Sequence, residues 1–140
     1  MKKTTGELLD ILKQSPKIED YMEEELENLV ETTLDLYLKK LLTEKNISAS
    51  NMIRLSGLDR TYTYQILEGK KHPSRDKLLA IGFALKLTFE EMQTMLKSTG
   101  YPPLYARIRR DSIIIFALKH GSSLIDTNEL LYQFDFELIQ

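Results

Sequence analysis

The chain contains no cysteine and no tryptophan, and only two of its 140 residues are histidine. The lack of cysteine excludes disulfides, thiolate metal ligands and thiol nucleophiles. His72 and His120 have no histidine partner at the spacing of a metal site, and there is no glycine-rich phosphate loop or nucleophile paired with a histidine. We therefore expect no enzymatic activity, no bound metal and no cofactor.

Long apolar stretches are also missing. The longest run extends from Ile113 to Leu118, far below the roughly 18 residues that a membrane-spanning helix needs. The basic start of the chain, Met1 to Lys3, turns acidic within a few residues, and no apolar segment of a signal peptide follows it. These absences predict a cytoplasmic protein that does not contact the membrane.

Charge is unevenly distributed along the chain, although the formal net charge is only −2. Residues 1–31 contain 4 basic and 9 acidic residues, which gives −5, and residues 101–140 contain 4 and 5, which gives −1. Residues 39–77 contain 9 basic and 4 acidic residues, which gives +5. A negatively charged partner, such as nucleic acid, is therefore expected to bind the middle segment.

Helical spacing of apolar residues dominates the sequence, and glycine and proline fall between the helical segments. Even the β-prone stretch from Ser112 to Phe116 lies inside a longer helical pattern, so we interpret it as a buried helix. An all-α fold is expected, with helices at about 4–13, 16–45, 48–56, 59–68, 74–86, 88–99, 104–120 and from Ser122 or Asp126 to Phe134. The second of these is either one long helix or two helices that break near residues 32–33.

The most informative stretch runs from Asn46 to Thr88, where two short helices are expected to meet at Gly57-Leu58-Asp59. A glycine at this turn supplies the left-handed backbone that a tight connection between helices needs. Gly69 closes the second helix, and a basic loop with a third helix follows. Helix caps are expected at Ser48, Asp59 and Ser74, and a capping box at Thr88 and Glu91.

This stretch resembles the lambda-repressor-like, Cro-type (xenobiotic-response-element) helix-turn-helix family of bacterial and phage transcriptional regulators. The similarity covers residues 34–88, and its most specific part is the spacing of two glycines with a basic loop behind the second. The matching residues fit without a gap: Ile47, Ile53, Gly57, Leu58, Ile66, Gly69, Lys70, Lys71, Pro73, Ser74, Leu78, Leu79, Ile81, Leu85 and Thr88. The resemblance implies a helix-turn-helix bundle at residues 34–99. Outside it, the helical spacing and charge of the sequence predict an acidic helical leader at 1–33 and a C-terminal helical hairpin at 100–140.

The resemblance also implies a recognition helix at about residues 59–68 that enters the major groove of duplex DNA. Four of its side chains are expected to face the bases. Arginine bonds guanine edges or phosphate, glutamine bonds adenine, threonine meets a thymine methyl or phosphate, and tyrosine offers a hydroxyl and a ring. These side chains are Arg60, Thr61, Tyr64 and Gln65.

A second group of residues is expected to bind the phosphate backbone, which fixes the position of the protein without reading sequence. This group comprises Lys70, Lys71, Ser74 and Arg75. The predicted function is sequence-specific DNA binding that regulates transcription.

Small regulators of this kind usually occupy two half-sites, so a homodimer is expected. The contact surface would be the leader or a set of apolar tail residues: Ile113, Ile114, Phe116, Leu118, Leu124, Leu130, Leu131, Phe134 and Phe136. The alternative is that these tail residues pack onto their own domain. In either case the turn Arg109-Arg110-Asp111 is interpreted as an exposed part of a helix.

A second hypothesis is a protein-interaction module on the same fold, such as an antitoxin, an adaptor or a partner of a signalling enzyme, that does not bind DNA. Three features motivate it: the net negative charge, Ala49 where the family usually has a glutamine, and a tail without an evident DNA role. The protein partner would then bind residues 1–33 or 100–140. The acidic leader is either a solvated face, a mimic of nucleic acid, or a cover that inhibits the basic segment.

Overall fold

The computed structural model describes residues 4–14 and 32–140, and every regular element within them is an α-helix. The all-α expectation is therefore confirmed for this part of the chain. The chain divides into two units, Met1–Glu31 and Thr32–Gln140. In the first unit, α1 covers Thr5–Gln14, and the remainder of the expected leader lies outside the described residues. None of the described helices is both long and apolar enough to cross a bilayer.

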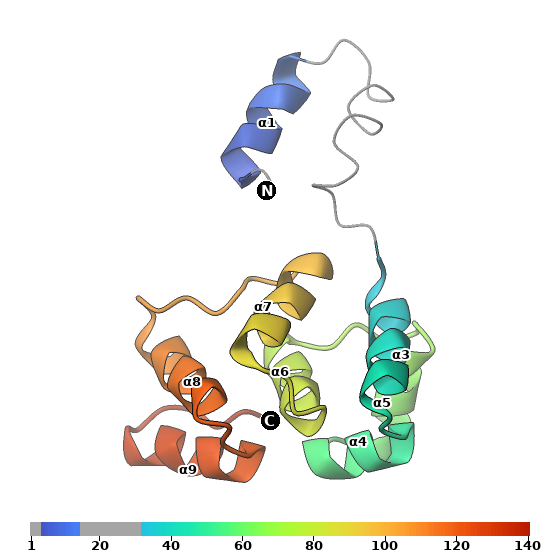
Figure 1. The fold of residues 1–140 in the computed structure, drawn as a ribbon, viewed down its shortest axis with the longest axis vertical. Coiled ribbons are helices and arrows are strands. Elements are labelled where there is room, and N and C mark those ends of the chain that lie inside the picture. Colours follow the sequence, from blue (N-terminus) through green and yellow to red (C-terminus); the bar gives the residue numbers. More distant parts are fainter. Residues whose placement is uncertain (1–3, 15–31) are drawn as a thin grey trace. The chain divides into compact units, whose positions relative to one another are not determined.

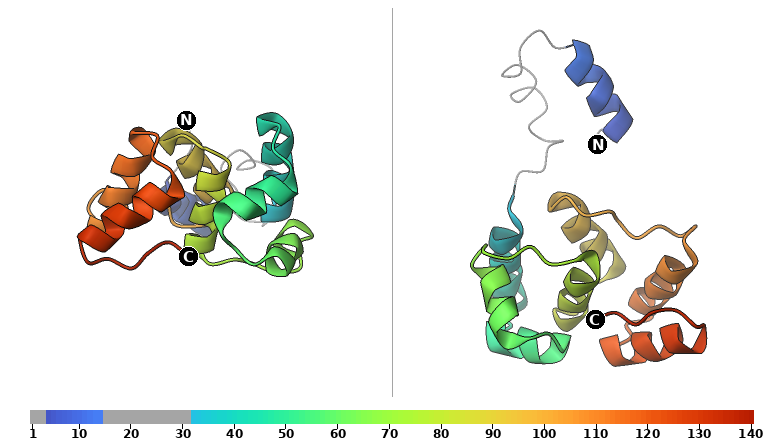
Figure 2. Two further views of the ribbon diagram at one scale, coloured as in Figure 1. Left: turned by 90° about the horizontal axis from the view of Figure 1, so that it is seen from below. Right: turned by 180° about the vertical axis from the view of Figure 1, so that it is seen from behind.

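Seven helices build the second unit, and two of them occupy its middle. In Figures 1 and 2, α6 and α7 lie between α3, α4 and α5 on one side and the hairpin of α8 and α9 on the other. The helices are α3 (Leu34–Lys45), α4 (Ala49–Ser56), α5 (Arg60–Leu67), α6 (Arg75–Ala84), α7 (Phe89–Ser98), α8 (Arg109–Lys119) and α9 (Leu124–Gln133).

The central position of α6 follows from its sequence, which is apolar on all sides after its charged first turn. Every residue from Leu78 to Ala84 is buried, as is usual for a helix without a polar face. α4 packs against one side of α6 and α9 against another. The peripheral helices bury one stripe each, as α3 does with Leu34, Leu38 and Leu41 at helical spacing.

The expected helix caps are confirmed. The side chains of Ser48, Asp59 and Ser74 each accept a hydrogen bond from the backbone N–H three residues later, at the starts of α4, α5 and α6. Thr88 and Glu91 form the reciprocal capping box of α7. These short-range bonds fix where four consecutive helices begin, which is why the local sequence predicts them.

Two expectations for the C-terminal helices are wrong. α8 begins at Arg109 rather than near Leu104, because the side-chain amide of Gln93 binds both the backbone C=O and N–H of Leu104, at 2.9 and 2.7 Å. That contact with α7 holds the chain outside a helix until residue 109. The cap of α9 is Ser123, which lies between the two expected starts.

Most of the tail's apolar side chains pack onto their own unit, although some remain exposed. Ile114, Leu118 and Leu131 are buried in the common core. Phe116 and Phe134, from the same expected set, are more than half exposed. The structure therefore favours intramolecular packing for the first group and leaves the second group uncovered within residues 32–140.

Two reciprocal ion pairs fasten the tail to α6. Arg75 donates to both carboxylate oxygens of Asp111 at 3.1 and 2.8 Å, and Arg110 donates to both of Asp76 at 3.0 and 2.8 Å. The dipeptide Arg-Asp thus occurs in the first turn of both helices, and each arginine pairs with the other helix's aspartate. The expectation of an exposed turn at Arg109-Arg110-Asp111 is wrong for Asp111, whose side chain is only 3% exposed.

The protonation of Asp111 couples this contact to pH. Burial alone would raise the pKa of its carboxyl group, but the Arg75 guanidinium and the N–H of Tyr105 outweigh burial and hold the pKa below the ordinary 3.8. Because the pKa of Asp111 is lower in the folded than in the unfolded protein, its ionised carboxylate stabilises the fold fully above pH 3.8. This stabilisation is lost as the pH falls through the folded pKa.

We expect Asp111→Asn to lower the free energy of unfolding at neutral pH by about 3 kcal/mol, because it leaves the Arg75 guanidinium without its buried counter-charge. The difference from wild type should shrink as the pH falls below 3.8 toward the lower folded pKa of Asp111, where the wild-type carboxylate itself becomes protonated. Urea denaturation across this pH range measures both effects. As a control, Glu44→Gln removes an exposed pair with Lys40 and should change stability by less than about 0.5 kcal/mol. Equal losses from the two substitutions would contradict this role for Asp111.

Candidate nucleic-acid interface

The connection between α4 and α5 is a tight turn with its polar groups satisfied. The buried Ser56 hydroxyl donates to a carbonyl one turn earlier in α4, at 2.8 Å, and accepts the N–H of Leu58 at 3.3 Å. Gly57 takes the left-handed conformation, with φ +70°. On the other side of the turn, the fully buried Thr63 donates to the Asp59 carbonyl at 2.7 Å. These contacts fix the angle between the two helices.

α5 packs on α3 and α4 and leaves its opposite side uncovered by them. Its buried residues are Thr63, Ile66 and Leu67. The structure brings the four predicted base-facing residues together on the first two turns of this helix. Arg60 and Thr61 are exposed, and Tyr64 and Gln65 are half-buried.

Arg60 is held in place by neighbours on two helices. Its guanidinium donates to the Ser50 hydroxyl of α4 at 3.3 Å and to the Tyr64 hydroxyl at 3.5 Å, and it lies 5.3 Å from the centre of the Tyr64 ring. Ser50 was not among the predicted site residues, because nothing in the local sequence indicates that the side chain of Arg60, ten residues later, contacts it. The arrangement aims a cation away from the core at the start of α5.

The loop after α5 places two further cations beside that helix. The backbone N–H groups of Lys70 and Lys71 both donate to the Gln65 carbonyl, at 2.9 and 3.3 Å, and both side chains are exposed. The Lys70 ammonium group binds the Glu68 carboxylate at 2.9 Å, and this hydrogen bond raises the pKa of Lys70. Ser74 is exposed too, with its hydroxyl capping α6.

Arg75 is separated from the other predicted phosphate contacts. Besides Asp111, its guanidinium donates to the carbonyls of Pro102 and Pro103, both at 2.9 Å, and the side chain is only 23% exposed. These contacts turn it toward the tail. Among the eight predicted site residues, two charges are paired within residues 32–140: Arg75 is bound by the tail, and Lys70 pairs with the exposed Glu68 carboxylate.

The tail also shapes the loop that carries the two lysines. The Tyr101 hydroxyl donates to the Pro73 carbonyl at 2.7 Å, and its ring stacks on His72 with a centroid distance of 5.1 Å. Burial of the Tyr101 side chain raises its pKa to about 12. The tail residues that hold the loop were not predicted, because the contact joins segments 28 residues apart.

The two histidines contact other groups of the protein. His72 stacks on Tyr101 as described, and the Nδ1 of His120 lies 2.8 Å from the carbonyl of Phe116 at the end of α8. Within the part of the chain that the structure describes, no group of three or more His, Cys, Asp or Glu side chains is arranged to hold a metal ion.

Comparison of the chain with protein-family models, with curated proteins and with solved structures finds no match.

Gly57 and Gly69 allow the effect of an added Cβ to be compared at two positions of this site. Both have positive φ, but an added Cβ at Gly57 would meet open space, whereas at Gly69 it would lie 3.1 Å from an Asp35 carboxylate oxygen. We expect Gly57→Ala to lower the free energy of unfolding by about 1 kcal/mol, because alanine is strained in the left-handed conformation, and Gly69→Ala to lower it further. Thermal unfolding of both variants, repeated in an Asp35→Ala background, measures this. If the excess cost at Gly69 persists without the Asp35 carboxylate, crowding by that group is not its cause.

Proposed function

We propose that residues 34–99 form a lambda-repressor-like helix-turn-helix domain that binds duplex DNA sequence-specifically and regulates transcription. The observation that carries this proposal is the orientation of α5. The helix buries one face against α3 and α4, while Arg60 and Thr61 in its first turn are exposed. A short helix anchored on one side with polar groups free at its N-terminal end suits insertion into a major groove.

The contacts of Arg60 support a role in base recognition. Ser50 and Tyr64 restrict its guanidinium before DNA arrives, so less side-chain entropy is lost on binding. In this proposal Arg60 binds a guanine edge and Gln65, one turn further along α5, binds an adenine. Thr61 and Tyr64 contact a thymine methyl group, a phosphate or a neighbouring base.

Phosphate binding falls to the loop and the start of α6. Lys71 and Lys70 supply positive charge, and Ser74 lies at the N-terminus of α6, whose free N–H groups favour an anion. Arg75 takes no part in the proposed interface, because its donors are already used by the tail. The proposed backbone contacts are therefore fewer than the sequence alone suggests.

We expect the double substitution Arg60→Ala with Gln65→Ala to abolish sequence-specific binding without loss of helicity, since both side chains lie outside the core. The measurement is an electrophoretic mobility shift against a library of genomic fragments, with circular dichroism for helicity. Arg107→Ala with Gln133→Ala removes the same residue types at exposed positions of the tail and should leave the shifts unchanged. If the first variant shifts the same fragments as wild type, α5 is not the recognition helix.

The loop lysines should contribute to affinity without contributing to sequence preference. Each phosphate contact adds about 0.9 to the slope of log affinity against log salt concentration. We expect Lys71→Ala to weaken binding to all fragments alike and to reduce that slope by about 1. Fluorescence anisotropy at several salt concentrations gives the slope. Lys97→Ala, on the exposed surface of α7, serves as the control, and an unchanged slope in Lys71→Ala would remove this lysine from the interface.

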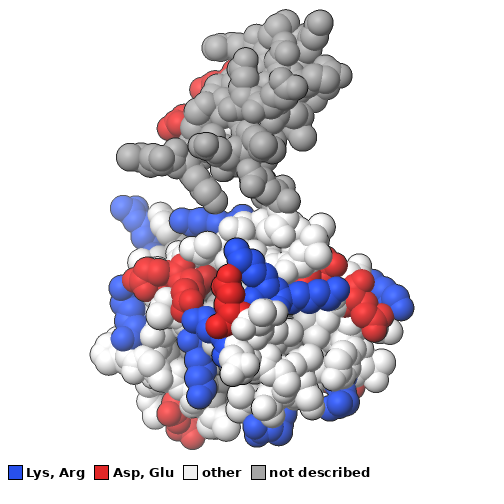
Figure 3. Space-filling view, turned by 45° about the vertical axis from the view of Figure 1, so that its right-hand side comes forward, with Lys and Arg blue, Asp and Glu red and all other residues white. Residues whose placement is uncertain are grey.

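Two observations favour the alternative of a protein-interaction module. On the face seen in Figure 3, basic and acidic side chains are interspersed rather than gathered into one basic patch. In addition, Ile125 and Tyr132 on α9 are 73% and 76% exposed, as expected of a surface that meets another protein. Failure of the chain to bind DNA-cellulose at about 50 mM salt, where phosphate contacts are strongest, would favour this alternative.

A further inference from the structure

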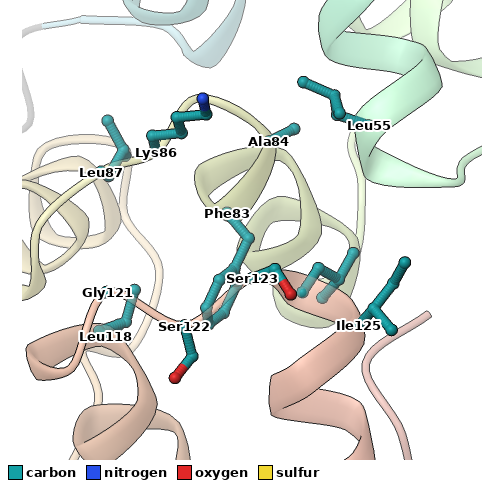
Figure 4. Close-up of a pocket in the computed structure, with 11 residues that line it drawn as sticks. Leu55, Phe83, Ala84, Lys86, Leu87, Leu118, Gly121, Ser122, Ser123 and Ile125 are labelled. Atoms are coloured by element: carbon teal, nitrogen blue, oxygen red, sulfur yellow. The ribbon is translucent and has the colours of Figure 1, made fainter.

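A pocket of about 420 Å³ opens where the tail hairpin meets the end of α6. Figure 4 shows the ends of α4 and α6 on one side of it and the α8–α9 turn on the other. Most of its lining side chains are apolar, and a lysine and two serines lie at its edge. Its lining residues include Leu55, Phe83, Lys86, Leu118, Leu124 and Ile125.

The size and lining of this pocket suit a small apolar ligand. Pockets that bind small molecules usually have volumes of about 300–1,000 Å³ and are mostly apolar, with a few polar groups that orient the ligand. Phe83 forms the floor and is itself 7% exposed, while Leu55 and Ile125 at the mouth are 42% and 73% exposed. The pocket is thus open to a ligand from solvent.

Lys86 supplies a positive charge at its rim. It follows the C-cap of α6 with φ +56°, in the left-handed conformation that glycine or asparagine usually takes at this place. The N–H groups of Lys86 and Leu87 donate to the carbonyls of Phe83 and Gly82, so the conformation is fixed. In Figure 4 the Lys86 side chain runs along the upper edge of the pocket from beside Leu87 toward Leu55. No carboxylate among the described residues forms an ion pair with it.

We propose that this pocket binds a small amphipathic carboxylic acid, with its apolar body between Phe83, Leu118 and Leu124 and its carboxylate at the Lys86 ammonium group. The single positive charge of Lys86 beside an apolar lining complements a ligand that has one negative charge and an apolar body. Because Leu55 belongs to α4, which also carries Ser50, the ligand would contact the helix that positions Arg60. The inference does not depend on DNA binding, and its test needs no DNA.

The test uses the full chain and octanoate as the probe, with octanol and octylamine as matched compounds of the same chain length. We expect octanoate to raise the thermal unfolding temperature and to give saturable heat in titration calorimetry, and octylamine to do neither. Lys86→Gln should weaken octanoate binding about fivefold, the effect of one partly exposed ion pair, without changing binding of octanol. Lys97→Gln, a lysine remote from the pocket, should leave both unchanged. Leu55→Gln should weaken both octanoate and octanol.

Three outcomes would overturn the proposal. The first is the absence of saturable octanoate binding at millimolar concentration. The second is equal octanoate affinity in wild type and Lys86→Gln, which would remove the charge from the site. The third is a dimer in sedimentation velocity that Leu55→Gln converts into a monomer, because a second copy of the chain would then fill the groove. Loss of DNA binding with octanoate binding intact would overturn the proposed function alone.

Discussion

The structure of residues 32–140 depends above all on the reciprocal pairing of two Arg-Asp dipeptides. Each arginine approaches both oxygens of the other helix's aspartate, a geometry that fixes orientation as well as distance. Because Asp111 is buried, its charge is tolerable only while Arg75 and the N–H of Tyr105 remain in place. The first turns of α6 and α8 are consequently held together, and the tail that begins at residue 100 belongs to the same compact unit as the helices before it.

This constraint reaches the candidate DNA interface through the segment that precedes α8. Arg75 binds the carbonyls of Pro102 and Pro103, which places Tyr101 against the loop after α5. The hydroxyl and ring of Tyr101 then fix Pro73 and His72, two and one residues after Lys71. A tail without an evident DNA role in the sequence therefore supports the backbone of the loop that carries Lys70 and Lys71.

Much of the fold could be predicted from the sequence because it depends on short-range signals. Caps such as Ser48 and Asp59 act within three residues, and Gly57 marks its turn by backbone conformation alone. The start of α8 could not be predicted, since it depends on Gln93, which holds Leu104 outside the helix from eleven residues away. The repeated Arg-Asp dipeptide was a signal for the tail contact, but only the fold brings its two occurrences together. For the same reason, Arg75 was assigned to phosphate from its local position, and its partner lies 36 residues further on.

The position of α6 links the candidate DNA interface to the pocket, because its two ends adjoin one of them each. Its N-terminal turn is bound by the tail and adjoins the loop of the candidate interface, and its C-terminal end forms the floor of the pocket at Phe83. Every residue between Leu78 and Ala84 is buried, so the helix has no freedom to shift without disturbing the packing of α4 on one side and α9 on the other. A ligand bound between Leu55 and the start of α9 would therefore act on α4 through rigid packing. Since α4 also carries Ser50, the side chain that orients Arg60, the shortest physical route from the pocket to the proposed DNA contact runs along this one helix.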